Sequence, residues 1–119
     1  MKVIIAGCRD FSDYECVRAH IDPSKISEIV SGAAKGVDAL GERFAFENAI
    51  PVKQFPADWN KHGKSAGPIR NRQMAQYADR LIAFWDGKSR GTKNMIETMK
   101  EYDKPVTVHM ISVNTGAKT

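Results

Sequence analysis

The alternation of apolar runs with amphipathic segments is the feature that most constrains the fold of this chain. Five short apolar runs have the length and composition of strands: Lys2–Ala6, Ile26–Ser31, Val52–Phe55, Arg80–Trp85 and Pro105–Met110. Four segments between them have helical periodicity: Ser12–His20, Val37–Asn48, Gly67–Ala78 and Gly91–Tyr102. Strands that alternate with helices and are nearly continuously apolar are typical of a parallel sheet with helices on both faces. We therefore predict an α/β fold, a single Rossmann-like, doubly wound domain with about five parallel strands.

Length and composition fit one globular domain without a membrane span. The chain has 119 residues, of which 42% are hydrophobic and 27% charged, and apolar runs such as Val3 to Ala6 are far too short to cross a membrane. We expect the domain to occupy residues 1–113, followed by a flexible C-terminal tail at 114–119. Because no signal-peptide pattern follows Lys2, we expect a cytoplasmic protein in which Cys8 and Cys16 are reduced thiols that mainly pack.

The loops that leave the predicted strands differ in charge from those that enter them. The leaving loops hold nine Lys or Arg, five carboxylates and seven of the nine glycines, and they lie at Gly7–Asp13, Ser31–Asp38, Pro56–Arg72 and Trp85–Lys93. The entering loops hold three basic residues, four acidic residues and no glycine. Ligands of doubly wound sheets bind beyond the carboxyl ends of the strands. We therefore predict an anion-binding rim at that end of the sheet, although a net charge of +4 is too small to indicate a nucleic-acid binder by itself.

The stretch "SGAAKGVD", residues 31–38, follows the second predicted strand. Glycine allows a ligand to approach the backbone closely, and a helix start attracts phosphate. We assign Gly32 and Gly36 to close approach and Lys35 to a phosphate, while Asp38 lies at the helix start or binds a ribose hydroxyl. Ser31 is a further ligand-binding candidate. The alternative is a tight turn of small residues in which Lys35 is only solvated.

The stretch "DGKSRGTKN", residues 86–94, follows the fourth predicted strand. We expect an anion-binding nest at the next helix start, with added charge from Lys88 and Arg90. Its expected ligand contacts are Asp86, Gly87, Ser89, Gly91 and Thr92. The P-loop pattern and the GxGxxG fingerprint are both missing from the sequence, so neither an ATPase nor an ordinary NAD site is indicated. The alternative is a polar surface turn.

Two further stretches place arginines on the same rim. In "AGPIRNRQM", Arg70 and Arg72 lie in a first helical turn, where their charge opposes the helix dipole and favours a bound anion. They are two residues apart and point in different directions, so we expect one to bind ligand and the other to pair with a carboxylate. In "AGCRDF", Gly7 and Arg9 are phosphate-binding candidates, and Phe11 is expected to pack.

These stretches together resemble the SLOG superfamily, named for the SMF/DprA and "lonely guy" (LOG) proteins, and in particular its small YspA-related bacterial and phage branch. The resemblance rests on "IIAGCRDF", "EIVSGAAKGVDALGERFA", "FPADWNKHGKSAGPIRNRQMA" and "LIAFWDGKSRGTKNMI", and it spans roughly residues 2 to 110. It implies a Rossmann-like fold that binds nucleotides or nucleotide-derived ligands. Because relatives in the superfamily commonly dimerise, it also implies a homo-oligomer.

The resemblance to LOG enzymes also implies an activity. These enzymes cleave the N-glycosidic bond of nucleoside 5′-monophosphates with an arginine before a helix and a glutamate two residues beyond a GGxGT motif. Arg72 matches the arginine, but "KSRGT" lacks the paired glycines and the glutamate position is Asn94. Glu97, one helical turn later, is the substitute candidate, so Arg72 and Glu97 are the catalytic candidates. Cys8 occupies a position where this branch usually has glycine.

Our first hypothesis is a sensor or sequestering module that binds a nucleotide-derived small molecule. The alternative is a LOG-like hydrolase of nucleoside monophosphates. A second, less favoured alternative is single-stranded nucleic acid binding, suggested by the DprA relationship and by Trp59 beside Lys61 and Lys64 in one long loop, where the tryptophan is a base-stacking candidate. We expect no cofactor, no metal and no membrane partner. The sequence leaves open the base and the number of phosphates.

Overall fold

The computed structural model describes residues 1–113 and contains one five-stranded parallel sheet in the order β3-β2-β1-β4-β5. Its strands are β1 (Lys2–Gly7), β2 (Glu28–Ser31), β3 (Val52–Gln54), β4 (Arg80–Trp85) and β5 (Val106–Met110). The helices are α1 (Tyr14–Ala19), α2 (Val37–Glu47), α3 (Trp59–His62), α4 (Ala66–Tyr77) and α5 (Arg90–Glu101), with short 3-10 turns η1 (Pro23–Lys25) and η2 (Gly63–Ser65). The predicted Rossmann-like fold is therefore confirmed. The predicted tail at 114–119 lies outside the described residues.

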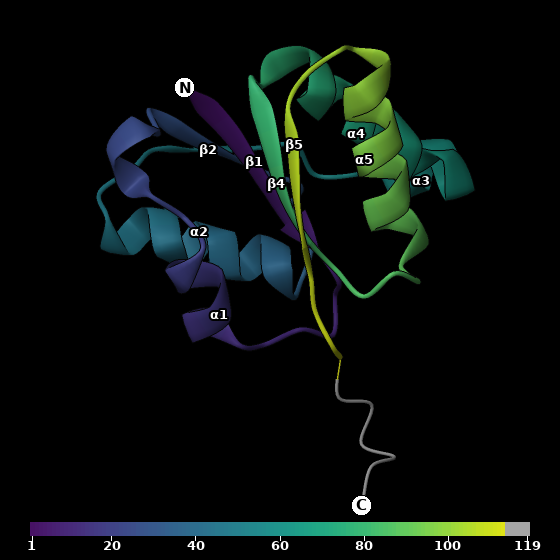
Figure 1. Cartoon of the computed structure of the whole chain (residues 1–119). Coiled ribbons are helices and arrows are strands. Elements are labelled where there is room, and N and C mark those ends of the chain that lie inside the picture. Colours follow the sequence, from purple (N-terminus) through teal and green to yellow (C-terminus); the bar gives the residue numbers. More distant parts are fainter. Residues whose placement is uncertain (114–119) are drawn as a thin grey trace, which may run out of the picture.

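Each face of the sheet has its own apolar core, because successive strand residues point to opposite faces. Figure 1 shows α1 and α2 on one side of the sheet and α4 and α5 on the other. On β1, Val3 and Ile5 belong to the core beneath α1 and α2, while Ile4 belongs to the core beneath α4 and α5. Helix α2 lies very close to β1, since a Cβ at Gly41 would be 2.7 Å from Cβ of Ile5. Among residues 1–113, no helix is both long and apolar enough to cross a bilayer.

The order of the strands creates a crevice beside β1. The chain builds β1, β2 and β3 outward in one direction, then returns through α3 and α4 to place β4 on the other edge of β1. In the last register pair of these two strands, Gly7 lies opposite Phe84. The loops that leave β1 and β4 then run to different faces of the sheet, and this divergence is the usual ligand position in doubly wound folds.

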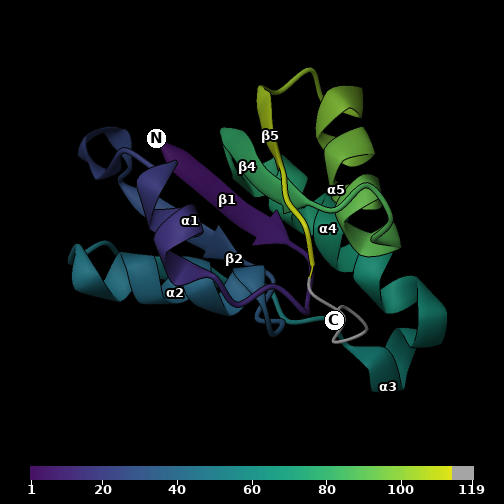
Figure 2. The same cartoon turned by 60° about the horizontal axis from the view of Figure 1, so that its bottom comes forward.

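Two local features differ from the sequence predictions. The first helical segment was predicted to begin at Ser12, but α1 begins at Tyr14, and the Asp13 side chain caps it by accepting a hydrogen bond from the Cys16 N–H at 3.2 Å. The loop predicted after β3 contains α3, which Figure 2 shows beyond one end of α4. The Asp58 side chain caps α3 by accepting from the Lys61 N–H at 3.1 Å. A single helical turn is too short to produce a recognisable periodicity.

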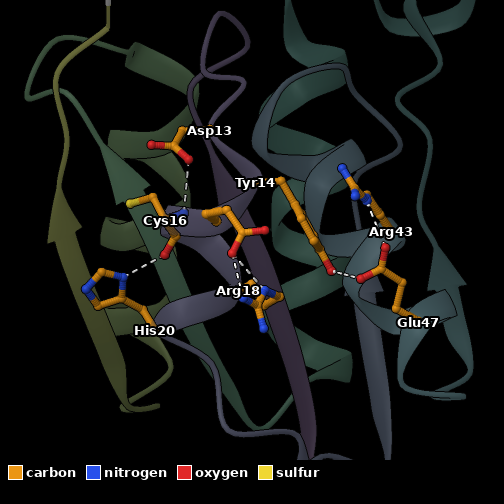
Figure 3. A network of polar contacts seen from close by, with 8 residues as sticks. Asp13, Tyr14, Cys16, Arg18, His20, Arg43 and Glu47 are labelled. Atoms are coloured by element: carbon orange, nitrogen blue, oxygen red, sulfur yellow. Dashed lines mark hydrogen bonds and ion pairs between the residues drawn. The ribbon is translucent and has the colours of Figure 1, made fainter.

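A polar network holds α1 against α2, on the face opposite α4 and α5 (Figure 3). The Tyr14 hydroxyl donates to Oε1 of Glu47 at 2.6 Å, and Nε of Arg43 donates to Oε2 of the same carboxylate at 3.0 Å. The Arg43 guanidinium also lies 3.9 Å from the centroid of the Tyr14 ring. Burial and the Glu47 carboxylate raise the pKa of Tyr14 to about 12, so its hydroxyl remains a donor at neutral pH. This network anchors the helices that support the loop after β1.

Candidate functional site

A cavity of about 610 Å³ opens at the carboxyl ends of β1 and β4, where the strand order reverses. We call it the main cavity. Its walls come from the loop after β1, the loop before α2, α3, the start of α4, and the loop and first turn that lead into α5. Five basic side chains line it, against three carboxylates: Arg9, Lys64, Arg70, Lys88 and Arg90 against Asp10, Asp38 and Asp86. The cavity therefore suits an anionic ligand.

The loop between β4 and α5 is held rigidly by its own hydrogen bonds. Oδ1 of Asp86 accepts from the N–H groups of Lys88 at 2.8 Å and Ser89 at 2.9 Å, and these bonds lower the pKa of the Asp86 carboxyl. Ser89 caps α5, with its Oγ 3.0 Å from Oγ1 of the buried Thr92. Within the described residues, the N–H groups of Arg90 and Gly91 have no hydrogen-bond partner. They are donors at a positively polarised helix end, and both residues line the cavity.

Gly91 is surrounded by open space at this helix end, whereas protein atoms lie close against three other glycines of the predicted site, Gly7, Gly32 and Gly36. Nothing lies within 4 Å of a Cβ built at Gly91. A Cβ at Gly7 would be 2.2 Å from the Phe84 carbonyl oxygen, and one at Gly32 would be 2.5 Å from Nη1 of Arg70. Gly36 has φ of 77°, and its Cβ would be 2.3 Å from the Cys8 carbonyl oxygen. Gly7 therefore allows close packing of β1 against β4, Gly32 makes room for the Arg70 side chain, and Gly36 lets the loop before α2 pack against the loop after β1.

Arg70 and Asn71 connect α4 to the loop before α2 and to the first turns of α5. The Arg70 side chain is half-buried; Nη1 donates to the Gly32 carbonyl oxygen at 2.5 Å, and Nε donates to Oδ1 of Asn71 at 3.0 Å. Nδ2 of the buried Asn71 donates to Oδ1 of Asn94 at 2.9 Å and to the Gly91 carbonyl oxygen at 3.3 Å. Sequence reasoning did not include Asn71 in the site and treated Asn94 only as a departure from the LOG motif. The sequence feature that could have identified both residues is an asparagine inside a predicted helix, because asparagine is a poor helix former.

Asp38 is a buried carboxylate that faces the main cavity. It is 6% exposed and lines the cavity at the first turn of α2. One oxygen accepts from the Ala34 N–H at 3.3 Å, and in the described part of the chain the carboxylate has no ion-pair partner within 4.0 Å. Burial raises its pKa to about 6, although the Ala34 N–H and the nearby Arg70 and Arg9 oppose the rise. At neutral pH Asp38 is therefore mostly ionised and has acceptor capacity left for a ligand hydroxyl.

Cys8 lines the cavity but is not a reactive thiol. Its side chain is 3% exposed, and burial is the main cause that raises its pKa to about 11. Since the thiolate is the nucleophilic form, we expect Cys8 to be unreactive at neutral pH, and its side chain packs in the apolar core beneath α1 and α2.

The structure brings eight of the predicted ligand contacts together in the main cavity: Gly7, Arg9, Asp38, Arg70, Asp86, Ser89, Gly91 and Thr92. The other five do not line it: Ser31, Gly32, Lys35, Gly36 and Gly87. Lys35 is exposed on the surface, and Gly87 has φ of 84° in the turn after β4. Oγ of Ser31 donates to Oε2 of Glu42 at 2.6 Å, so its role is structural.

The two candidate catalytic residues lie away from the main cavity. Arg72 lines a second cavity of about 450 Å³ between α4 and α5; its Nη1 lies 3.8 Å from Oε1 of Glu101 and donates to the Tyr102 hydroxyl at 3.5 Å. Glu97 is exposed and lines neither cavity. The two arginines thus point in different directions, with Arg70 facing the main cavity and Arg72 pairing with a carboxylate. The prediction that both lie in a first helical turn was wrong, because α4 begins at Ala66 and both follow its first turn.

Comparisons with known proteins identify the family and the fold of this chain. The family described as YspA, cpYpsA-related SLOG matches residues 1–62. The Gene 61 protein of Mycobacterium phage D29 is 32% identical over 118 residues, covering 88% of this chain and 93% of that protein. The X-ray structure of DNA processing protein A (DprA) from Streptococcus pneumoniae superposes with a TM-score of 0.76 and 21% identity, covering 97% of this chain. The chain spans about half of the DprA chain, 52%, and this likeness shows the fold.

Proposed function

Because this chain belongs to the YspA, cpYpsA-related SLOG family, we propose that it binds a nucleotide or nucleotide-derived phosphate compound in the main cavity. The observation that carries the proposal is the convergence on one cavity of a helix N-terminus with open backbone donors, five basic side chains and the buried Asp38 carboxylate. This combination suits a ligand that carries both phosphate and sugar hydroxyls.

The phosphate lies at the start of α5 in this proposal. The N–H groups of Arg90 and Gly91 donate to its oxygens, and the absence of a side chain at Gly91 permits close approach. The Lys88 and Arg90 side chains are exposed and line the same end of the cavity, so they add positive charge without being buried. The loop needs little reorganisation on binding, because Asp86 and Ser89 already fix it.

The sugar lies beside Asp38. A carboxylate accepts hydrogen bonds from vicinal hydroxyls, and Asp38 lines the cavity with acceptor capacity to spare. Arg70 is close enough to influence the Asp38 carboxylate electrostatically and holds the loop before α2 in place through the Gly32 carbonyl group. Separate phosphate and ribose subsites in one cavity favour a nucleotide over a free anion.

Calorimetric titration with AMP, ADP, ADP-ribose and cyclic AMP tests the proposal. We expect binding of at least one of these, weakened about tenfold or more in the double variant K88A/R90A, because charged hydrogen bonds to phosphate contribute about 1.5–3 kcal/mol each. The matched control is Lys93→Ala, which removes an exposed charge from the same helix at a position that does not line the cavity. Absence of binding to every compound, or equal weakening by the control, would contradict the proposal.

The same mixtures also test hydrolysis. We infer binding without glycosidic cleavage, because Arg72 and Glu97 do not line the main cavity. Chromatography of the incubated AMP samples is expected to show no free adenine. Release of adenine that is lost in Arg72→Ala would instead support the LOG-like hydrolase.

Single-stranded nucleic acid is a second candidate, because the two cavities adjoin. They share Lys64, Pro68 and Asn94 in their linings, and Arg72 lines only the second cavity. The name of the structural neighbour, DNA processing protein A, is consistent with this candidate. Oligonucleotide binding that falls steeply with salt, and that weakens in Arg72→Ala while AMP affinity does not, would favour it.

A further inference from the structure

The main cavity has an aromatic end that phosphate and ribose binding leave unused. Trp59 is the only aromatic residue among the described ones that line it, and the side chain is 51% exposed. A large apolar ring that lines a polar cavity and remains half in water provides a flat surface for a planar partner.

The capped start of α3 and the neighbouring helix α4 hold the Trp59 indole ring in place. Trp59 is the first residue of α3, whose N-terminus is capped by Asp58, so the residue does not belong to a loose loop. Its Cη2 atom would lie 3.5 Å from a Cβ at Gly67, an ordinary packing distance, so α4 supports one side of the indole. The ring is therefore positioned before any ligand arrives.

Arg9 lies across from this ring. The centre of its guanidinium is 5.9 Å from the centroid of the Trp59 ring, and both side chains line the cavity. Two stacking layers of roughly 3.5–4 Å each need about 7–8 Å. A small shift of the exposed Arg9 side chain thus admits one planar group between the guanidinium and the indole.

We propose that Trp59 and Arg9 form a base subsite, in which the nucleobase of the ligand stacks on the indole and the guanidinium lies over its other face. This rests on the proposed nucleotide binding and names the part of the ligand that the phosphate and ribose contacts leave open. Every base has a π face, so the subsite selects compounds with a base over sugar phosphates and discriminates weakly between bases.

The test compares AMP and CMP with ribose 5-phosphate on the intact protein, with sugar phosphate affinity measured directly or by displacement of AMP. We expect Trp59→Leu to weaken AMP and CMP binding about tenfold while ribose 5-phosphate affinity is unchanged. Trp59→Phe, which keeps an aromatic face, is expected to lose less. Phe46→Leu is the matched control, because Phe46 is 87% exposed on α2 and does not line the cavity.

A second measurement does not require the leucine variant to fold. AMP is expected to quench tryptophan emission more strongly in the wild type than in Trp59→Phe, and ribose 5-phosphate is expected to leave it unchanged. Equal AMP affinity in wild type and Trp59→Leu, or equal quenching in wild type and Trp59→Phe, overturns the base subsite while nucleotide binding stands. Failure of the wild type to bind AMP, CMP, ribose 5-phosphate and every compound of the first titration overturns both proposals.

Discussion

Replacing Asp38 by asparagine is expected to stabilise the protein at neutral pH. The buried carboxylate has no ion-pair partner among residues 1–113, and burial raises its pKa from 3.8 to about 6. At about 1.4 kcal/mol per pH unit, this shift corresponds to about 3 kcal/mol of lost stability above pH 6. A residue that destabilises its own fold in this way is typical of a binding or catalytic site.

The sign of the effect defines the pH window. Below pH 3.8 Asp38 is protonated in both the folded and the unfolded chain, so its ionisation does not affect stability. As the pH rises toward 6 the unfolded chain loses this proton first, which favours unfolding. The free energy of unfolding of D38N minus that of the wild type is therefore expected to rise by about 2–3 kcal/mol between pH 4 and pH 8.

Urea unfolding at pH 4, 5, 6, 7 and 8 measures this difference. The pH dependence is the informative quantity, because any fixed cost of burying the asparagine amide applies at every pH. Asp10→Asn is the matched control; Asp10 lines the same cavity but is exposed, and its variant is expected to differ little from the wild type across the range. A D38N difference that is constant with pH, or that falls as pH rises, would refute the reasoning.

Three further predictions concern glycine, arginine and cysteine residues. Gly36→Ala is expected to lower the free energy of unfolding, measured by urea titration, by about 2–3 kcal/mol, because φ is 77° and the new Cβ would meet the Cys8 carbonyl oxygen. Gly91→Ala is expected to change the free energy of unfolding by less than about 1 kcal/mol, because the space around Gly91 is open. Arg72→Ala is expected to leave AMP affinity unchanged and to alter stability by less than about 1 kcal/mol, since its ion pair with Glu101 is exposed; calorimetry and urea unfolding check both, and loss of AMP binding would contradict the placement of the ligand. In a Cys16→Ser background, Cys8 is expected to react slowly with iodoacetamide at pH 8, because its pKa is about 11, and rapid alkylation of the folded protein would be the opposite result.

The fold was predictable because its signals are local and repeated. Each apolar run became a strand within about two residues, and β4 begins and ends at the predicted residues, Arg80 and Trp85. The enrichment of one rim in glycine and basic residues predicted the end of the sheet at which the main cavity opens, since parallel strands all end there. Helix α3 was missed because one turn, capped by Asp58, carries no periodicity.

The site was less predictable, because its details depend on contacts between distant residues. Arg70 and Arg72 cannot be told apart by their sequence context. In the structure, Arg70 donates to the Gly32 carbonyl group and faces the main cavity, whereas Arg72 lies beside Glu101. Gly32 and Gly36 have the pattern of a phosphate loop, yet in the structure they make room for Arg70 and for the Cys8 carbonyl group. Asn71, which joins α4 to α5, has its partners about twenty residues away.

A crystal structure of the protein with AMP tests the central claim most directly. We predict that the phosphate lies within hydrogen-bonding distance of the Gly91 N–H, with the ribose hydroxyls at Asp38. A phosphate held by Arg72 in the second cavity, with the start of α5 free of ligand, would contradict the account.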